Sequence, residues 1–551
     1  MIVAMKHLDL VCTAGDGETT LERLRSLGVV HLDLNAASGE NVTAAKGELI
    51  AAEKAVRLIF KARESVGEGE CRPRSVAEII ALDRDRETLV SERDRLEREI
   101  RAYEPYGDFD PELVRRLQDR GVDLSSVAEL PAKLPEMRLS KLKEKHSRVV
   151  NRINVDTAKI AIADERAIMS EYPAMIDRMK FAEARELLLD RGQVAVISGW
   201  VPKNRRQCVI DAANTCGWGV LLRDPEPGEV PPTLIEPPKL FRPVKVLFDG
   251  LGISPGYTEG DVSVPFMCYF SLFFAMLVGD GAYGCIFLFA ALFLRRRLSR
   301  SWFALLMVFS LATVAWGALS NTWFGAAIPF CADWPTVKWL ADPSYRNMML
   351  LCFTIGVSHL MLARIWNGMC KLNDTSCMAE FGWAGVLFFM YLVTNSIVGI
   401  FDGIPSWAFV VFGVSLVLVF GFTVKPSELR TRGAELGMLP LNVMSALGDI
   451  ISYVRLFAVG LASVKVAENF NSMALGLLDG ADAAWMKALM SVAMVAILVV
   501  GHSLNLAMAG LSILVHAVRL NTLEFSNHKG VSWSGYAFDP FRKQKGENHN
   551  E

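Results

Sequence analysis

A single arginine stands inside a long apolar stretch near the carboxyl end of the chain, and it limits what the chain can fold into. The stretch SYVRLFAVGLA covers residues 452–462 and carries Arg455. A guanidinium keeps its charge at every physiological pH, and placing it at bilayer depth costs about 3 kcal/mol on the most lenient scale. Arg455 therefore needs a path to water or a partner. It is either a structural residue paired with a carboxylate on a neighbouring helix or a functional one.

A second arginine recurs in the last apolar run, GHSLNLAMAGLSILVHAVRLNTLEF at 501–525, which carries Arg519. Upstream, a phenylalanine-rich run at 266–284 ends in the motif GDGAYG. These segments resemble the membrane part of the ion-translocating stator subunit of rotary V-type and A-type ATPases, called subunit a or subunit I. The family's first-hairpin motif is Gly-Asp-x-Gly-Tyr-Gly, so the order Gly281-Ala282 is a minor departure from it.

The resemblance implies which subunits supply the groups for ion translocation and for ATP hydrolysis. Arg455 would face a rotating ring of proteolipid subunits, which supplies an ion-binding carboxylate in trans. Arg519 is carried over with it as a second candidate catalytic residue. The implied partners are this ring, peripheral-stalk heterodimers of the E/G type, a central-stalk subunit of the C/d type, membrane lipid and, indirectly, the A/B head that hydrolyses ATP. A permanent guanidinium can compensate the rotor carboxylate without storing a proton itself.

Polar residues on the two arginine-bearing helices are the candidates for an ion pathway. They are Asp449, Ser452, Glu468, Asn505, Ser512, His516 and Glu524. The 3.6-residue period places Asn505, Ser512 and Arg519 near one face with Gly501, Met508 and Ser526, as expected for a water-filled half-channel. Taken singly, Asn505 or Ser512 is more typical of a hydrogen bond between helices. His516 is either a proton relay or a satisfied interfacial residue.

Three residues of the upstream motif, Gly279, Asp280 and Gly284, are predicted to be structural, with Asp280 also among the acidic candidates. Two positions depart from the family. Ser463 stands where many relatives carry His, so no proton-relay role transfers to it, and Lys465 is unexpected inside the same helix.

The composition describes two different parts. The chain of 551 residues is 52% hydrophobic and 21% charged. Residues 1 to about 260 are rich in charge, whereas 264–519 hold repeated apolar runs of membrane-spanning length. Charges of both signs are interspersed, which gives no indication of nucleic-acid binding. The ten cysteines are scattered without a CxxC pair, so neither a disulfide framework nor a zinc site is indicated. The amino terminus has no signal-peptide core, and we expect this half to be cytoplasmic.

The first half predicts a small sheet and a helical hairpin. Strand, helix and strand are expected at 2–13, 20–27 and 29–34, and again at 194–200, 203–216 and 218–222, so that two β-α-β units complete one sheet. Between them, Leu82, Leu89, Leu96 and Tyr103 repeat every seven residues in a long charged helix. A second helical segment at 140–191 predicts an antiparallel hairpin, although a coiled-coil dimerisation arm has the same pattern. The resemblance implies a dumbbell-shaped stator domain.

The predicted domains are a cytoplasmic stator domain (1–223), a proline-rich linker (224–262), a membrane domain (263–526) and a cytoplasmic tail (527–551). The stator domain has a proximal lobe (1–40 with 192–223) and a hairpin with a small distal lobe (41–191). Eight spans are expected: two from a hairpin at 264–294, then 302–321, 347–366, 379–400, 407–424, 436–478 and 485–524. This count places Arg364, Lys371, Lys425, Arg430, Arg432, Arg542, Lys543 and Lys545 on the cytoplasmic side.

The last two spans are nearly twice the length needed to cross a bilayer, so both must tilt strongly or extend beyond it. The fold class is therefore mainly α, with a cytoplasmic α/β dumbbell followed by a membrane domain with two long tilted helices. No Walker-type phosphate loop, nucleophile elbow or metal-ligand cluster is present in the sequence, so ATP chemistry is assigned to partners and we expect neither a cofactor nor a metal in this chain. The alternatives are a secondary transporter that binds an anion between Arg455 and Arg519, and a membrane sensor with a coiled coil.

Overall fold

The computed structural model describes residues 2–33, 39–67, 71–120, 131, 134–186, 188–190, 193–331, 333–340, 342–424, 429–477 and 484–543. The chain divides into two compact units. One comprises residues 5–225 with the segment from 539 onward, and the other comprises residues 1–4 with 226–538. The first is called the sheet unit here and the second the membrane unit.

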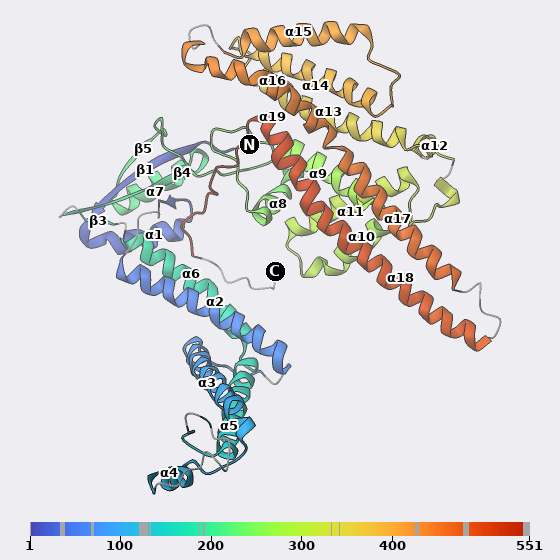
Figure 1. The fold of residues 1–551 in the computed structure, drawn as a ribbon. Helices are drawn as coiled ribbons and strands as arrows, with labels where there is room; N and C mark the ends of the chain where they lie inside the picture. The colour runs from blue at the N-terminus through green and yellow to red at the C-terminus, as the bar shows by residue number, and fades with distance from the viewer. Residues whose placement is uncertain are drawn as a thin grey trace. The chain divides into compact units, whose positions relative to one another are not determined.

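The sheet unit contains the predicted single sheet (Figure 1). Its strands are β1 (Met5–Thr13), β2 (His31–Leu32), β3 (Leu189–Asp190), β4 (Val194–Pro202) and β5 (Gly219–Arg223), in the order β2-β4-β1-β5 with β3 also paired to β4. All pairs are antiparallel. Alternate residues of β1, Leu8 and Leu10 among them, are buried against α1 (Gly17–Leu27) and α7 (Arg206–Cys216). The two sequence-distant β-α-β units therefore complete one sheet, as predicted.

The predicted hairpin is built from two broken arms. The outgoing arm is α2 (Glu40–Val66) followed by α3 (Val76–Tyr103), and the returning arm is α5 (Leu139–Ala161) followed by α6 (Glu165–Glu186). Arg72 and Ala163 form a bridge where both arms break. The heptad residues Leu89 and Leu96 pack with Leu142 and Val149 of α5, so this seam is filled within the chain. A short helix, α4 (Pro111–Asp119), follows α3, whereas 121–130 of the predicted distal lobe lie outside the described residues.

The segment from residue 539 packs against the sheet unit. Phe541 is 4% exposed in the core of that unit, and its backbone N–H donates to the Val30 carbonyl over 2.7 Å. His31 Nδ1 lies 2.9 Å from the Asp539 carbonyl oxygen. Burial lowers the pKa of His31 despite the opposing contact with Asp539. The predicted separate tail at 527–551 is therefore split, because residues up to 538 group with the membrane unit.

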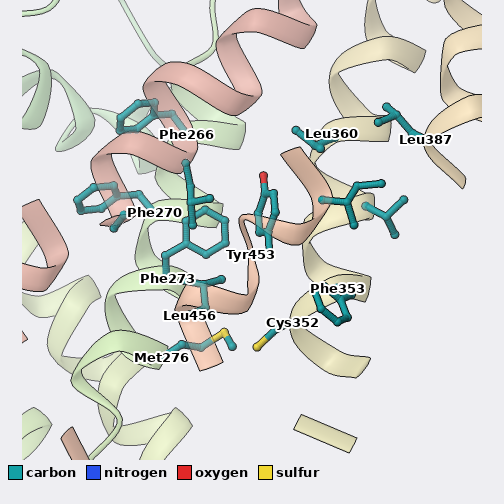
Figure 2. Packing of buried hydrophobic residues seen from close by; sticks show 14 of the residues in the cluster. Phe266, Phe270, Phe273, Met276, Cys352, Phe353, Leu360, Leu387, Tyr453 and Leu456 are labelled. Carbon is teal, nitrogen blue, oxygen red and sulfur yellow. The ribbon is translucent and has the colours of Figure 1, made fainter. Parts of the chain in front are cut away.

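The membrane unit is almost entirely helical. Its helices are α8 (Val244–Leu251), α9 (Ser263–Val278), α10 (Gly281–Phe293), α11 (Arg300–Ser320), α12 (Pro335–Leu340), α13 (Arg346–Cys370), α14 (Cys377–Ile397), α15 (Ser406–Phe422), α16 (Leu429–Ile451), α17 (Val454–Gly476), α18 (Ala484–Ser512) and α19 (Ser526–Lys529). Two π-helical segments, Ile513–Ala517 and Leu520–Phe525, join α18 to α19. The largest apolar core of the protein lies here, and Figure 2 shows Phe266, Phe273, Tyr453 and Leu456 within it.

Five helical stretches in the described residues are long and apolar enough to cross a membrane. Two of them, Leu436–Gly476 and Lys487–Lys529, are 41 and 43 residues long, as expected for the two overlong spans. Helices α9 and α10 are bent by 118° at the predicted turn and count as a broken span or a re-entrant loop, and α15 is shorter than the others. Of the basic residues predicted to be cytoplasmic, Lys425 and Lys545 fall outside the described residues, as do the side chains of Arg430 and Arg432.

Part of the predicted linker at 224–262 is helical. Residues 244–251 form α8, and its residues Val244 and Phe248 are buried in the core of the membrane unit. Proline density predicted an extended segment; most of its prolines lie at 225–243, Pro243 immediately precedes this helix, and Pro255 follows it. Proline at a helix start costs nothing, because the first N–H groups of a helix have no intrahelical partner.

The burial of His31 predicts a pH dependence for the sheet unit. The pKa of His31 is lowered in the folded state, so the unfolded chain binds more protons between the two pKa values. Stability from this residue is therefore present above the ordinary value of about 6.5 and is lost as pH falls below it. Amide exchange at Phe541, corrected for intrinsic rates, should accelerate between pH 7.5 and 5.5. His31→Gln should remove that acceleration, and an unchanged profile would contradict the assignment.

Candidate functional site

One carboxylate joins the two arginines that the sequence singled out. Arg455 Nη2 donates to Glu524 Oε1 over 2.8 Å, and Arg519 Nε lies 3.3 Å from the same oxygen. The Glu524 side chain is 5% exposed, that of Arg455 is 23% exposed and that of Arg519 is 54% exposed. Two guanidinium groups thus share one carboxylate, which leaves this cluster with one positive charge in excess.

A break in the helix orients Arg455. The sequence 452–462 predicted one uninterrupted helix, but α16 ends at Ile451 and α17 begins at Val454. The Ser452 carbonyl in this break accepts from Arg455 Nε over 3.0 Å and from the Arg455 backbone N–H over 3.3 Å. The Ser452 hydroxyl donates to the Gly448 carbonyl instead of to a neighbouring helix. Ser452 therefore acts through its backbone, a role that its side-chain chemistry did not predict.

The π-helical segments change which side chains share a face. A π turn holds more residues than an α turn, so each segment rotates the side chains that follow it. Asn505 and Ser526 are 1% exposed, while Met508 is 48% exposed and Arg519 is more than half exposed. The exposures of these residues therefore differ along the final helix, and the single polar face stays a prediction. Glu524 lies within the second π-helical segment, where its carboxylate reaches Arg455.

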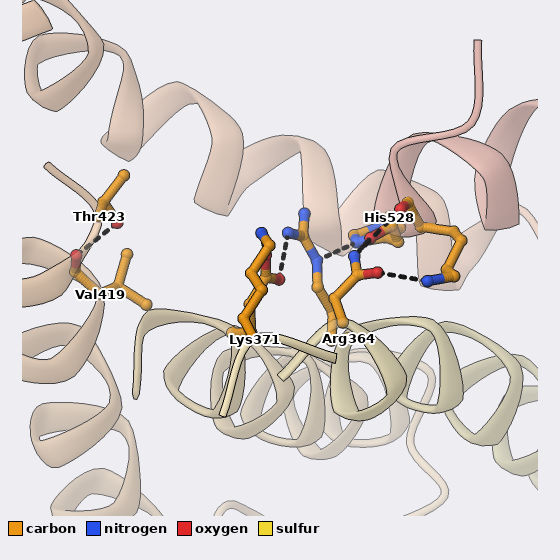
Figure 3. Close-up of polar contacts among 8 residues, drawn as sticks. Arg364, Lys371, Val419, Thr423 and His528 are labelled. Carbon is orange, nitrogen blue, oxygen red and sulfur yellow. Dashed lines mark hydrogen bonds and ion pairs between the residues drawn. The ribbon is translucent and has the colours of Figure 1, made fainter. Parts of the chain in front are cut away.

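A second polar cluster surrounds Asp449. His528 Nε2 lies 3.0 Å from Asp449 Oδ2. Arg364 Nε donates to His528 Nδ1 over 3.1 Å, a bond that Figure 3 shows. Because Nδ1 accepts, Nε2 carries the proton that is donated to Asp449. Glu380 in turn pairs with Arg364 at 3.1 Å and with Lys371 at 2.6 Å. A cavity of about 470 Å³ borders this cluster and is lined by Arg364, Asp449, His528, Asn442 and Ser445 among others.

A third cluster surrounds Asn505. Its Nδ2 donates to the Ser463 carbonyl over 2.9 Å and to the Tyr283 hydroxyl over 3.1 Å, and its Oδ1 accepts from the Ser463 hydroxyl. Tyr283 is also 2.7 Å from His502 Nδ1, and His502 Nε2 is 3.2 Å from Asn471 Oδ1. Asn505 thus joins α18 to α17 and α10, which is the interhelical hydrogen bonding that its residue type favours.

The GDGAYG motif is structural. Gly279 has a left-handed φ of +71° and ends α9, while Asp280 is 1% exposed and caps α10 by accepting from the Ala282 N–H. The other Asp280 oxygen accepts from the Gly325 N–H over 2.8 Å. A Cβ at Gly284 would lie 2.8 Å from the Val314 nitrogen, so the residue lets α10 and α11 approach closely. Asp280 is therefore fully occupied as a cap.

The remaining predicted residues lie apart from these clusters. Glu468 forms a 2.6 Å pair with Lys465 one helical turn away, and both side chains are at least 40% exposed. Ser512 is half-buried at the end of α18. His516 is half-buried in the first π-helical segment, and its Nδ1 has no hydrogen-bond partner among the described residues.

Sequence reasoning missed several polar residues that the structure brings to these clusters. They are Arg364, Glu380, Tyr283, Asn471, His502 and His528. Arg364 and Lys371 had been treated only as positive charges flanking a span. The signal that could have found Arg364 is the acidic residue Glu380 in the next apolar run, one of few acids in these runs. Arg364 of α13 pairs with Glu380 of α14 in the structure.

Comparisons with known proteins agree on one family. The chain is 32% identical to V-type ATP synthase subunit I of Borreliella burgdorferi over 382 residues. This alignment covers 65% of this chain and 62% of that protein. It is 27% identical to V-type ATP synthase subunit I 1 of Treponema pallidum over 99% of this chain and 100% of that protein. A-type ATP synthase subunit I of Methanocaldococcus jannaschii is 22% identical over 78% of this chain. No protein-family model matches the chain.

The shared carboxylate predicts a difference between two glutamates. Glu524→Gln removes the anion between two guanidinium groups, and breaking a largely buried pair in this way costs about 3 kcal/mol or more. Glu468→Gln breaks an exposed pair worth at most about 1 kcal/mol. In detergent, thermal unfolding of the purified chain should show a clear loss of Tm for the first variant and almost none for the second. Equal losses would contradict the ion-pair geometry.

Proposed function

Because the chain belongs to the subunit I family of V-type and A-type ATP synthases, we propose that it is the subunit that moves ions across the membrane. In this proposal a rotating ring of proteolipid subunits carries an ion-binding carboxylate past Arg455. The arginine displaces the carried ion as the carboxylate arrives and blocks direct passage from one side to the other. The ring, the stalks and the ATP-hydrolysing head are separate proteins.

The observation that carries the proposal is the charge excess at the arginine cluster. Glu524 neutralises one of the two guanidinium groups, so one positive charge remains for an incoming carboxylate. Arg455 is also partly exposed, which leaves it within reach of a partner side chain. An arginine wholly satisfied inside the chain would have favoured the structural interpretation. A secondary transporter would also use a positive site, but it would need to hold both arginines towards an enclosed substrate, and Arg519 is mostly exposed.

The surface beside the cluster suits a sliding contact. In the final long helix, 17% of an apolar 18-residue stretch is buried inside the chain, against 33–67% of the corresponding stretches of the other candidate spans. Exposed apolar side chains run along it, including Val492, Val499, Leu511, Val515 and Leu523. Such a surface is stable against lipid or against another apolar helix, and it offers few polar groups that would hold a moving partner in one place.

Two offset access paths are proposed on either side of the arginine cluster. On the final helix Asn505 precedes Arg519 and Glu524, and His528 follows them. On the antiparallel partner, Ser463 follows Arg455 and Asp449 precedes it. The polar groups around Asn505 and the cavity beside Asp449 therefore lie on opposite sides of the arginine cluster along the helix pair. Half-channels placed there would leave the arginine between them, as two-path transport requires.

The sheet unit is proposed to be the cytoplasmic stator domain, with the carboxyl-terminal segment on the same side. Its intramolecular hairpin, α2 and α3 against α5 and α6, provides long charged surfaces on which E/G-type peripheral stalks could be held. Contact with a C/d-type central-stalk subunit is part of the same proposal. The proposed topology keeps eight spans, with α9 and α10 as two short ones.

Replacing Arg455 tests the proposed function directly. Arg455→Ala should abolish ATP-driven ion transport by the reconstituted complex while leaving the complex assembled. Arg455→Lys should restore little, because an ammonium is compact and can lose its proton when desolvated. Arg296→Ala, which removes an exposed arginine outside the cluster, is the matched control and should transport normally. Transport at the wild-type rate by Arg455→Ala would refute the proposal.

Accessibility of cysteines along the final helix tests the two paths. In a background without the ten native cysteines, Leu504→Cys should react with a membrane-impermeant thiol reagent from outside only. Asn527→Cys should react from the cytoplasm only, and both positions are exposed. The buried position Ala509→Cys should stay unlabelled from either side. Labelling of both exposed positions from the same side would reject the topology or the division into two paths.

A further inference from the structure

A fully buried histidine lies behind the arginine cluster. His359 of α13 is 0% exposed, in a helix that is itself a candidate span. Its ring is stacked between Tyr269, with ring centroids 4.0 Å apart, and Phe525, with centroids 4.4 Å apart and planes inclined by 9°. Phe273 contacts it edge-on at 5.5 Å. An apolar aromatic ring could fill the space among these three side chains. The polar atoms of a histidine at this position therefore need another explanation.

The first polar atom of this ring contacts the helix break. His359 Nδ1 is 2.9 Å from the Tyr453 hydroxyl, and Tyr453 lies in the two-residue break between α16 and α17. Tyr453 is 0% exposed and occupies a groove of α13, where a Cβ on Gly356 would come within 2.5 Å of its ring. Figure 2 shows Tyr453 inside the apolar core, with its hydroxyl oxygen in red. Arg455 follows two residues later, so the position of Tyr453 determines where the backbone of Arg455 lies.

The stacking partner contacts the other half of the pair. Phe525 follows Glu524 directly, at the end of the second π-helical segment, and is 0% exposed. The same helix α13 holds the following turn, because Asn367 donates to the carbonyls of His528 and Lys529. Stacking on His359 thus fixes the backbone next to Glu524, whose Oε1 accepts from Arg455. One imidazole contacts the neighbours of both members of the ion pair.

We propose that His359 is a positioning residue for ion translocation, which sets the distance between Arg455 and Glu524 by hydrogen bonding to Tyr453 and stacking on Phe525. The proposal rests on the proposed function of Arg455. His359 touches neither the ion nor the rotor carboxylate. Its Nε2 has no hydrogen-bond partner among the described residues, so the bond to Tyr453 is the polar contact that orients the ring. A buried imidazole with only one of its two nitrogens hydrogen-bonded lowers the stability of the fold. A positioning role explains why a histidine is nevertheless present here.

The test uses the complete complex, purified from membranes and reconstituted into liposomes. His359→Leu removes the hydrogen bond and the stacking, and coupled ion uptake should fall about tenfold. His359→Gln keeps a group that can bond to Tyr453 and should restore uptake to within about threefold of wild type. Tyr453→Phe removes one oxygen atom and should lower uptake by itself. The double variant of His359→Leu with Tyr453→Phe should transport no more slowly than His359→Leu alone, because both changes remove one shared interaction.

The controls separate positioning from stability and from the proposed function. Thr394→Val removes a buried hydroxyl of α14 that bonds only within its own helix, and it should transport normally. Wild-type uptake by both His359→Leu and Tyr453→Phe would overturn the proposal. So would losses that track the thermal stability of the complex without rescue by His359→Gln. Transport by Arg455→Ala would instead refute the proposed function, whereas an inactive Arg455→Ala with normal His359 variants would refute the positioning role alone.

Discussion

The carboxylate of Glu524, shared between Arg455 and Arg519, is the interaction on which the arrangement of the two long helices depends. A guanidinium beside a 43-residue apolar helix has few ways to be satisfied, and each requires a departure from regular structure. The helix break before α17 exposes the Ser452 carbonyl to Arg455, and the π-helical segments turn Glu524 towards it. Both departures lie next to the ion pair. Irregular turns of this kind cost backbone hydrogen bonding, so strong local contacts must hold them.

Helix α13 provides those contacts along most of its length. It receives Tyr453 in the groove at Gly356, stacks His359 on Phe525 and bonds through Asn367 to the last helical turn. An ordinary packing helix would present a uniform apolar stripe. Here aromatic stacking supports the break and the π-helical segment near the cluster, while polar bonds hold the end of the final helix at Arg364. The irregular parts of the site are therefore fastened to a regular helix, whose Arg364 also lines the cavity beside Asp449.

Sequence patterns predicted what depends on local order and missed what depends on partners distant in the chain. The alternation around Leu8 and the heptad around Leu96 led to the correct sheet and hairpin, because strand and helix periods are local properties. The faces of the final helix could not be predicted, since π-helical turns arise from tertiary contacts and change the period. The partner of Arg455 lies 69 residues away, and nothing in its neighbourhood marks Glu524 as that partner. His528 and Arg364 were missed because they lie far apart in the sequence and their contact forms only in the folded chain.

The buried residues between the three polar clusters explain why a separate rotor would be needed. On the final helix, Ala509, Ile513 and Ala517 are at most 8% exposed between Asn505 and the arginine cluster, and on α17 Leu456 and Gly460 are buried between Arg455 and Ser463. A Cβ on Gly460 would lie 2.5 Å from the Met276 carbonyl, so α17 and α9 pack closely at this point. An ion that reached either end would find no continuous polar path through these residues. Under the proposed function, only a carboxylate carried along the exposed faces of α17 and α18 could then connect the two ends.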